Sequence, residues 1–231
     1  MSGSLVAPVV LKLGGRVAAQ AAAQAHALVA SGHAVVVVHG AGPQISRELE
    51  RRAIPVAFVR GRRVTTEAVL DVVRESLAAL NAEVCAAVGP LAVGLLGDEA
   101  GLPAHPVREL GLVGDPLPAA PPPVLAALRA GRIPVLAPLG VHPDVGVLNV
   151  NADEAAAALA VGLGAARILF VSDVPGVLLD GDVVASLPVA AADELLSSGA
   201  VEGGIVPKLT AAVRAARRGV RAEIGLTEVL A

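Results

Sequence analysis

Cysteine and aromatic residues are nearly missing from this sequence of 231 residues. Cys85 is the single cysteine, so the chain can form neither an internal disulfide nor a cysteine-based metal cluster. Apolar residues at helical spacing before Cys85 predict a buried, inert thiol. Tryptophan and tyrosine do not occur, and with only Phe58 and Phe170 as aromatics the chain has no platform on which nucleic-acid bases would stack.

Neither basic nor acidic residues are in large excess. The chain carries 18 basic and 21 acidic residues, a formal net charge of −3, and the basic residues are scattered along it. Proteins that bind nucleic acid typically gather basic residues into a patch or stripe. We therefore expect no nucleic-acid partner.

Long apolar runs are also missing, although 55% of the residues are hydrophobic. The longest stretch without an acidic residue, lysine or arginine, residues 17–46, contains glutamine, serine, glycine and histidine. A membrane-spanning helix needs about 20 predominantly apolar residues. The first residues lack the pattern of a secretory signal. These features predict a cytoplasmic protein with no membrane partner.

Short apolar runs without alternation predict the buried strands of a parallel sheet. These runs are residues 9–13, 34–38, 91–95, 133–137 and 167–171. Helical patterns lie between or after them, at residues 17–31, 43–52, 66–87, 123–130, 152–163 and 207–218. This alternation predicts an α/β fold, a three-layer αβα sandwich with a mainly parallel central sheet.

Two further segments predict structure that overhangs the sheet. Residues 97–123 are dense in glycine and proline, and residues 54–64 have the pattern of a strand pair or hairpin. We interpret this irregular or antiparallel part as a candidate substrate lid. The chain has no internal repeat and no segment long enough to be a domain linker, so we expect one domain over residues 1–231.

Two lysines occupy positions that are unfavourable for a cation in isolation. Lys12 lies at the end of an apolar strand, separated only by Leu13 from Gly14 and Gly15. Lys208 lies in the first turn of a predicted helix, where it opposes the positive end of the helix dipole. Both positions are easier to explain if an anion lies opposite, and a glycine turn before a helix presents N–H groups to phosphate oxygens. We predict a polyphosphate partner, although a glycine pair alone is also ordinary turn chemistry.

Residues 39–43 form a second glycine-rich turn after a strand, with small residues that let a ligand approach the backbone. We interpret His39 as structural, because no acid or nucleophile accompanies it locally. Farther on, Arg62 and Arg63 precede a predicted helix. An arginine there either forks onto a carboxylate or is a solvated turn residue, and the segment alone does not decide between these interpretations.

Residues 149–154 begin an alanine-rich helix, with Asn151 as the expected N-cap and Asp153 placed to complement the helix dipole. Helix capping accounts for Asn151 but not for Asn149. In an extended segment the side chain of Asn149 points to the same side as that of Asn151. Residues 171–176 end another strand with a turn that could form the rim of a nucleotide site. No acidic or histidine group has metal-ligand spacing, so any Mg²⁺ is expected to arrive on the nucleotide and keep several waters.

Taken together, these motifs resemble the amino acid kinase family, and most closely its acetylglutamate kinase branch. The six motifs that carry the resemblance are residues 9–15, 38–45, 63–65, 148–154, 172–177 and 203–209. The resemblance implies ATP-dependent phosphorylation of the side-chain carboxylate of N-acetyl-L-glutamate, a step of arginine biosynthesis, with ATP and Mg²⁺ as cofactors. It also implies a homodimer, an N-terminal lobe of about residues 1–150 for the acyl amino acid, and a C-terminal lobe of about residues 151–231 for ATP.

The resemblance further implies roles for individual residues. Lys12 and Lys208 would stabilise the transferring phosphoryl group, and Asp153 would hold the lysines and metal-bound waters. The acceptor would be bound by Ala41, Gly42, Arg63 and Asn149. Phosphate and nucleotide would be bound by Gly14, Gly15, Asp173, Val174, Pro175, Gly176, Val177, Leu178, Ala200, Val201 and Glu202. An ionised carboxylate acceptor needs no general base, which agrees with the lack of a candidate base.

The sequence departs from the family pattern at two places. Ala41 stands where a glycine is usual, and residues 221–231 lack the helix and the glycine-threonine turn that usually precede the last strand. Two alternatives stay open. The chain either phosphorylates a related acidic acceptor, such as carrier-protein-linked aminoadipate or glutamate, or it is a catalytically silent sensor of a nucleotide or metabolite.

Overall fold

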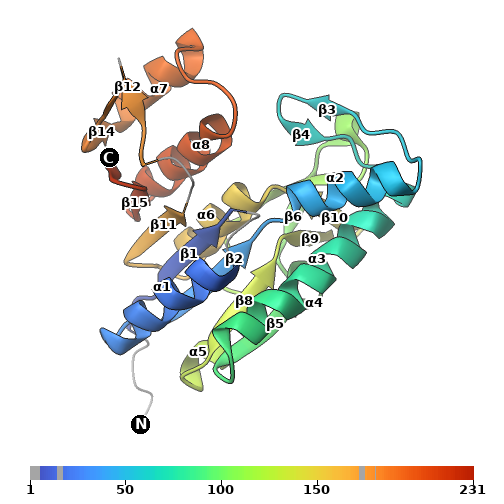
Figure 1. Cartoon of the computed structure of the whole chain (residues 1–231), viewed down its shortest axis with the longest axis horizontal. Helices are drawn as coiled ribbons and strands as arrows, with labels where there is room; N and C mark the ends of the chain where they lie inside the picture. Colours follow the sequence, from blue (N-terminus) through green and yellow to red (C-terminus); the bar gives the residue numbers. More distant parts are fainter. Residues whose placement is uncertain (1–5, 15–17, 172–174, 180) are drawn as a thin grey trace.

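An eight-stranded sheet crosses the centre of the protein in the computed structural model, which describes residues 6–14, 18–171, 175–179 and 181–231 (Figure 1). The strand order is β14-β16-β15-β11-β1-β2-β8-β5. The bounds are β1 Val9–Leu13, β2 Val35–His39, β5 Ala92–Leu96, β8 Ile133–Ala137, β11 Arg167–Val171, β14 Ser186–Pro188, β15 Arg221–Ile224 and β16 Thr227–Leu230. Neighbours are parallel except β15 and β16, so β14 and β16 run against the other six strands.

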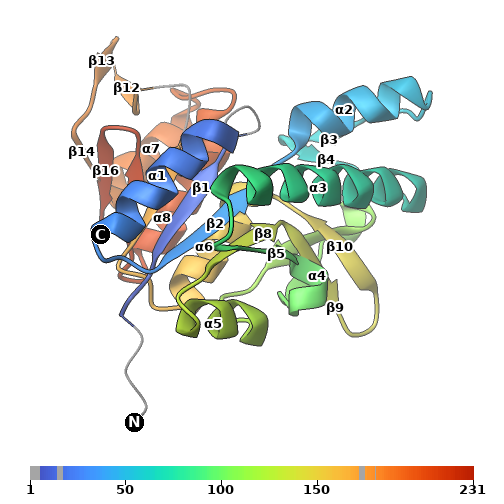
Figure 2. The ribbon, with the colours of Figure 1, turned by 60° about the horizontal axis from the view of Figure 1, so that its bottom comes forward.

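Helices cover both faces of this sheet, which confirms the predicted αβα sandwich (Figure 2). One face packs against α1 (Ala18–Ala30) and α3 (Glu67–Val88), and α2 (Gly42–Arg51) packs on α3 in the same apolar cluster. The other packs against α5 (Pro122–Arg129), α6 (Ala152–Gly162), α7 (Val189–Ser198) and α8 (Ile205–Ala216). Strand alternation explains the division, because Leu11 and Leu13 of β1 join the first apolar cluster and Val10 joins the second.

The predicted strands and helices of the sandwich are all present, each within two residues of its expected bounds. The elements that the sequence did not reveal are α7, β14, β15, β16, and a small hairpin of β12 (Leu178–Leu179) and β13 (Asp182–Val183). No described helix combines the length and the apolar character needed to cross a membrane.

A second sheet and a hairpin overhang the central sheet, as expected for residues 97–123 and 54–64. The second sheet has the order β6-β7-β10-β9, with β6 Ala104–Pro106, β7 Val113–Pro116, β9 Leu139–His142 and β10 Gly146–Val150. The short helix α4 (Gly97–Ala100) and the 3-10 helix η1 (Arg108–Leu110) lie in the same region. The hairpin consists of β3 (Phe58–Val59) and β4 (Arg62–Arg63). The β9–β10 hairpin was not predicted.

The strand ends place the candidate site. Strands β1 and β2 are parallel and in register, so Leu13 and His39 end them at one edge of the sheet. Ligands of open parallel sheets bind at the carboxyl ends of strands. Figure 1 shows α2 and the β3–β4 hairpin on one side of this edge and α8 on the other.

Candidate functional site

A cavity of about 290 Å³ opens at the edge where β1 and β2 end. It gathers residues from the two strand ends, the β3–β4 hairpin, the second sheet and the first turns of α2, α6 and α8. The described lining is Lys12, Gly14, Gly40, Ala41, Gly42, Ile45, Phe58, Gly61, Arg62, Arg63, Leu77, Val113, Pro138, Asn149, Val150, Asn151, Ala152, Asp153 and Lys208. The cavity therefore brings together all seven residues to which the sequence assigned catalysis or acceptor binding, and Gly14.

A buried ion pair lies in this cavity. Lys12 Nζ lies 2.7 Å from Asp153 Oδ1, and each residue is only 5% exposed. Lys12 shares a face of β1 with Val10, the face covered by α6, and Asp153 is the second residue of α6. Because desolvation offsets most of the attraction in a buried pair, such a pair is weak evidence for stability. Its place on a cavity wall favours a role with a ligand.

Three helices begin at the cavity, and the N-terminal end of a helix attracts anions. For α6, Asn151 Oδ1 accepts hydrogen bonds from the N–H groups of Asp153 (2.9 Å) and Glu154 (3.2 Å), which confirms Asn151 as the N-cap. A Cβ atom at Gly40 would lie 3.2 Å from Ala152 Cβ, so glycine lets the turn after β2 approach the start of α6.

The two lysines that the sequence singled out face this one cavity. Lys208 lies in the first turn of α8, and its ammonium group donates to the carbonyl oxygen of Gly204 at 3.0 Å. Lys12 reaches the same space from β1. Two amines from segments far apart in the chain are thus placed to meet one anion.

Arg63 is a buried cation in the same wall. It is 8% exposed, and its Nη2 donates to Ser46 Oγ (2.8 Å) and to the carbonyl oxygen of Gly42 (3.4 Å). The guanidinium also lies 4.6 Å from the centre of the Phe58 ring. Its Nη1 is buried without a hydrogen-bond partner among the described residues. Burial lowers the pKa of Arg63, so a carboxylate of a ligand would supply the counter-charge that the described protein atoms do not.

The side chain of Asn149 is oriented by a short chain of hydrogen bonds. Asn149 Nδ2 donates to Thr65 Oγ1 at 3.0 Å, and that hydroxyl donates to the carbonyl oxygen of Arg63 at 2.9 Å. This hydrogen bond uses one N–H of the side-chain amide and leaves the side-chain oxygen, Oδ1, as an acceptor for a ligand in the cavity that Asn149 lines. This accounts for the asparagine that helix capping did not explain.

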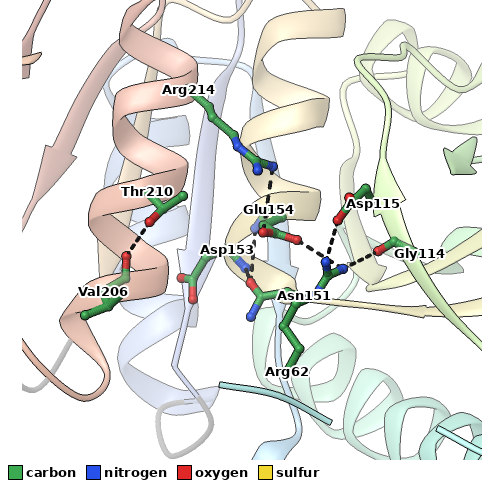
Figure 3. A network of polar contacts seen from close by, with 9 residues as sticks. All are labelled: Arg62, Gly114, Asp115, Asn151, Asp153, Glu154, Val206, Thr210 and Arg214. Atoms are coloured by element: carbon green, nitrogen blue, oxygen red, sulfur yellow. Dashed lines mark hydrogen bonds and ion pairs between the residues drawn. The ribbon is translucent and has the colours of Figure 1, made fainter. Parts of the chain in front are cut away.

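The sequence analysis missed a polar network beside the cavity (Figure 3). Arg62 donates from Nη1 to Asp115 Oδ1 (2.6 Å) and from Nη2 to the carbonyl oxygen of Gly114 (2.8 Å). The carboxylate of Glu154 lies 3.6 Å from Arg62 and 3.7 Å from Arg214. Glu154 follows Asn151 by three residues, an ordinary helix-start pattern, so its spacing carried no signal of this network.

His39 and Cys85 have structural surroundings. His39 is 1% exposed, its Nε2 lies 3.0 Å from Asn81 Nδ2, and burial lowers its pKa to about 4. It is therefore neutral near pH 7, which agrees with the structural interpretation. Cys85 is half-buried rather than buried, and burial raises the pKa of its thiol. A raised pKa disfavours the reactive thiolate.

The residues expected to bind nucleotide are only partly described. Gly15, Asp173 and Val174 lie outside the described residues. Pro175, Leu178, Ala200 and Glu202 are exposed, whereas Gly176, Val177 and Val201 are buried. Val177 and Val201 belong to the apolar core. The backbone of Val177 is also engaged, since its N–H donates to Thr227 Oγ1 and its carbonyl oxygen accepts from the N–H of Val184. Within the described part of these two segments, no residue lines the cavity.

The substitution at Ala41 is accommodated by the fold. Its φ of −128° is allowed for any residue, and the residue is 2% exposed within the apolar cluster on the α2 side of the sheet. Its carbonyl oxygen accepts from the N–H of Ile45 at 2.9 Å, the first hydrogen bond of α2. The methyl group therefore leaves the local backbone of the turn unstrained.

Comparison with known proteins gives consistent results. The profile of the amino acid kinase family matches residues 7–225. A protein of Rubrobacter xylanophilus named acetylglutamate kinase is 42% identical over 222 residues, which cover 94% of this chain and 87% of that protein. An acetylglutamate kinase of Frankia casuarinae is 42% identical over 207 residues, which cover 82% of this chain but only 57% of that longer relative. Among solved structures, the smu.665 protein of Streptococcus mutans UA159 has a TM-score of 0.88 and 27% identity, over 96% of this chain and 98% of that one.

Proposed function

This chain belongs to the amino acid kinase family, and we propose that it phosphorylates the side-chain carboxylate of N-acetyl-L-glutamate with ATP. A carboxylate oxygen forms a bond to the γ-phosphorus, the bond to the β–γ bridging oxygen breaks, and that oxygen keeps the electron pair as ADP leaves. The products are an acyl phosphate and ADP, and the step belongs to arginine biosynthesis. Relatives named acetylglutamate kinase support this choice of acceptor.

The charge of the cavity carries the proposal. Among the described lining residues are four cations, Lys12, Arg62, Arg63 and Lys208, and one anion, Asp153. Such an excess of positive charge in a partly closed space suits a reaction between two polyanions. A carboxylate and a nucleoside triphosphate repel each other in water, and the cations that line the cavity offset that repulsion.

For the acceptor, we assign Arg63 to a carboxylate, because its guanidinium is buried without an acidic partner among the described residues. Asn149 offers a carbonyl oxygen to the amide N–H of the acetyl group. Ala41 and Gly42 supply backbone at the start of α2, where free N–H groups attract the remaining anionic oxygens. The requirement for both an amide and a carboxylate gives selectivity for an acylated amino acid.

For phosphoryl transfer, we assign Lys12 and Lys208 to the oxygens of the migrating group, with Asp153 keeping Lys12 in place through the 2.7 Å contact. The acceptor is already ionised near pH 7, so positioning and charge stabilisation supply the catalysis. By analogy with loss of an oxyanion donor, removing either lysine is expected to cost about 2.7–4 kcal/mol of transition-state stabilisation.

For the nucleotide, we assign the backbone of Gly14 and Gly15 to phosphates and residues 173–178 and 200–202 to the remainder of ATP, in a C-terminal lobe of about residues 151–231. Mg²⁺ bound by the nucleotide would neutralise phosphate charge. Asp153, on the cavity wall, offers a carboxylate to the waters of such an ion.

We further propose that the protein acts as a homodimer in the cytoplasm. Light scattering at several protein concentrations tests the dimer, and a single species of monomer mass would reject it.

Trapping of the acyl phosphate with hydroxylamine tests the activity. We expect hydroxamate to form with ATP, Mg²⁺ and N-acetyl-L-glutamate, and to fall at least about a hundredfold in Lys208→Ala. Substrate specificity is tested by replacing the acceptor with carrier-linked aminoadipate or glutamate. Faster turnover of a carrier-linked acceptor would change the assigned substrate, and ligand binding without hydroxamate from any acceptor would show a sensor instead.

A further inference from the structure

Two neighbouring acidic residues at the start of α6 point in different directions (Figure 3). Asp153 faces Lys12 in the cavity, whereas the Glu154 carboxylate lies between Arg62 and Arg214, with one oxygen toward each. The Glu154 side chain is 12% exposed. A mostly buried carboxylate is thus shared by two arginines from distant parts of the chain.

Arg62 connects Glu154 to the hairpin over the cavity. It belongs to β4, directly before Arg63, and its guanidinium also binds Asp115 and the carbonyl oxygen of Gly114 on β7. The hairpin itself has only two residue pairs, and Phe58 and Val59 of β3 are 55% and 46% exposed. With little apolar burial in β3, the polar contacts of Arg62 are a main attachment of the hairpin to the body of the protein.

Arg214 connects Glu154 to the helix that carries Lys208. The two residues are six positions apart on α8, about 9 Å along the helix axis. Helices α6 and α8 pack against each other, and most of their buried residues are alanines, among them Ala155, Ala156, Ala211 and Ala212. Methyl groups form shallow ridges and grooves, which allow close approach but fix the axial position of a helix less firmly than interlocking large side chains. The ion pair between Arg214 of α8 and Glu154 of α6 crosses this interface and restrains the axial position of α8.

We propose that Glu154 is a positioning residue that links the β3–β4 hairpin to α8, so that acceptor binding under the hairpin and placement of Lys208 depend on each other. The kinetic consequence rests on the proposed function, because it concerns the phosphoryl group that Lys208 contacts. The mechanical link between hairpin and helix does not.

Glu154 is poorly explained as a stabilising residue. Burial is the largest influence on the pKa of Glu154 and raises it, Arg62 and Arg214 lower it, and Asp115 and Asp153 raise it, so that the net change is a rise. The ionised carboxylate that pairs with the two arginines is therefore less favourable in the folded protein than in the unfolded chain, and its charge does not stabilise the fold. Replacement by neutral glutamine is expected to leave the thermal unfolding temperature unchanged or higher.

Amide hydrogen exchange of the free protein tests the link without any ligand. We expect Arg214→Gln, which changes only α8, to speed exchange in residues 58–63 as well as in residues 205–212, and Glu154→Gln to do the same. Arg217→Gln is the matched control, because Arg217 also extends from the end of α8 but pairs with Asp193 of α7. If the hairpin exchanges at the wild-type rate in Arg214→Gln and Glu154→Gln, the proposal is wrong.

A kinetic double-mutant cycle tests the consequence for Lys208. In the wild-type background, Glu154→Gln is expected to lower kcat by about tenfold. In the Lys208→Ala background the same change is expected to lower kcat by less than about twofold, because its effect acts through the missing ammonium group. Equal factors in both backgrounds would overturn the coupling to Lys208. A wild-type protein that forms no acyl phosphate would reject the proposed function instead, and the exchange result would still decide the link.

Discussion

Replacing Asp153 by asparagine isolates the charge of the buried pair with Lys12. The substitution keeps the size and the polar character of the side chain, and it leaves the Lys12 ammonium group 5% exposed without its counter-charge. Breaking a buried ion pair by removing one partner costs about 3–5 kcal/mol. Three further cations line the same cavity and would repel the unpaired ammonium group. We therefore expect Asp153→Asn to lower the free energy of unfolding by about 3–5 kcal/mol.

The opposite replacement, Lys12→Met, is expected to cost less. It leaves the Asp153 carboxylate as the second residue of α6, where the helix dipole stabilises an anion by about 0.5–2 kcal/mol, and Lys208 lies in the same cavity. The free energy of unfolding should therefore fall by about 1–2 kcal/mol less than in Asp153→Asn. The double variant should be more stable than Asp153→Asn, because no unpaired charge remains at the pair.

Urea unfolding followed by far-ultraviolet circular dichroism measures these differences at a fixed protein concentration, since the chain has no tryptophan or tyrosine for fluorescence. Asp193→Asn is the control, because that carboxylate is 44% exposed in its pair with Arg217 and should contribute less than about 1 kcal/mol. The electrostatic argument fails if Lys12→Met destabilises the protein as much as Asp153→Asn, or if the double variant loses the sum of both.

Three further outcomes are expected. Arg63→Met should raise KM for N-acetyl-L-glutamate about 10- to 100-fold with a smaller change in kcat, because a charge-assisted hydrogen bond to a ligand carboxylate is lost; an unchanged KM would remove Arg63 from the acceptor site. Burial lowers the pKa of His39 from 6.5 to about 4, so between these pH values the His39 imidazole is protonated in the unfolded chain but neutral in the folded protein. The free energy of unfolding should fall by up to about 3 kcal/mol as the pH drops through this window, and His39→Gln should flatten this dependence in urea titrations. Gly97→Ala should lower the unfolding temperature by the equivalent of at least about 1–3 kcal/mol, since a Cβ atom would lie 2.1 Å from the carbonyl oxygen of Leu139.

The central sandwich could be predicted from the sequence because its signals are local. Strands buried on both faces read as continuous apolar runs, and residues 9–13, 133–137 and 167–171 match β1, β8 and β11 residue for residue. The second sheet could be predicted only as antiparallel or irregular structure, because its two local antiparallel pairs, β6–β7 and β9–β10, are joined by the parallel pairing of β7 with β10, which are far apart in the chain. Helix α7 escaped detection since Ala192 is its single buried residue and the helix has no clear apolar stripe.

In the candidate site, too, the residues with a local sequence signal could be predicted and the contacts made by the tertiary fold could not. Lys12, Asp153 and Lys208 could be singled out because each lies at a strand end or a helix start, where a charge has a known local effect. The position of Glu154 is equally local, yet its partners Arg62 and Arg214 come from a hairpin and a helix that only the tertiary fold brings near. Sequence periodicity does not encode such contacts, so the network appears only in the structure.

The absence of a helix between β15 and β16 is explained by the side chains of these two strands. Ala222 and Ile224 of β15 and Val229 of β16 face the core under α8, whereas the opposite face carries Arg221, Glu223 and Glu228.

These charged residues pair with one another along the outer face. Glu223 and Glu228 are cross-strand neighbours, and Arg221 Nε lies 3.0 Å from the first and 2.8 Å from the second, which offsets their mutual repulsion. Alternating apolar and charged residues are the pattern of a sheet with one solvated face. The two strands therefore need no helix on that side. The family difference that the sequence showed at residues 221–231 is matched by a mainly charged face, on which Leu230 of β16 and Leu226 of the turn are exposed apolar residues.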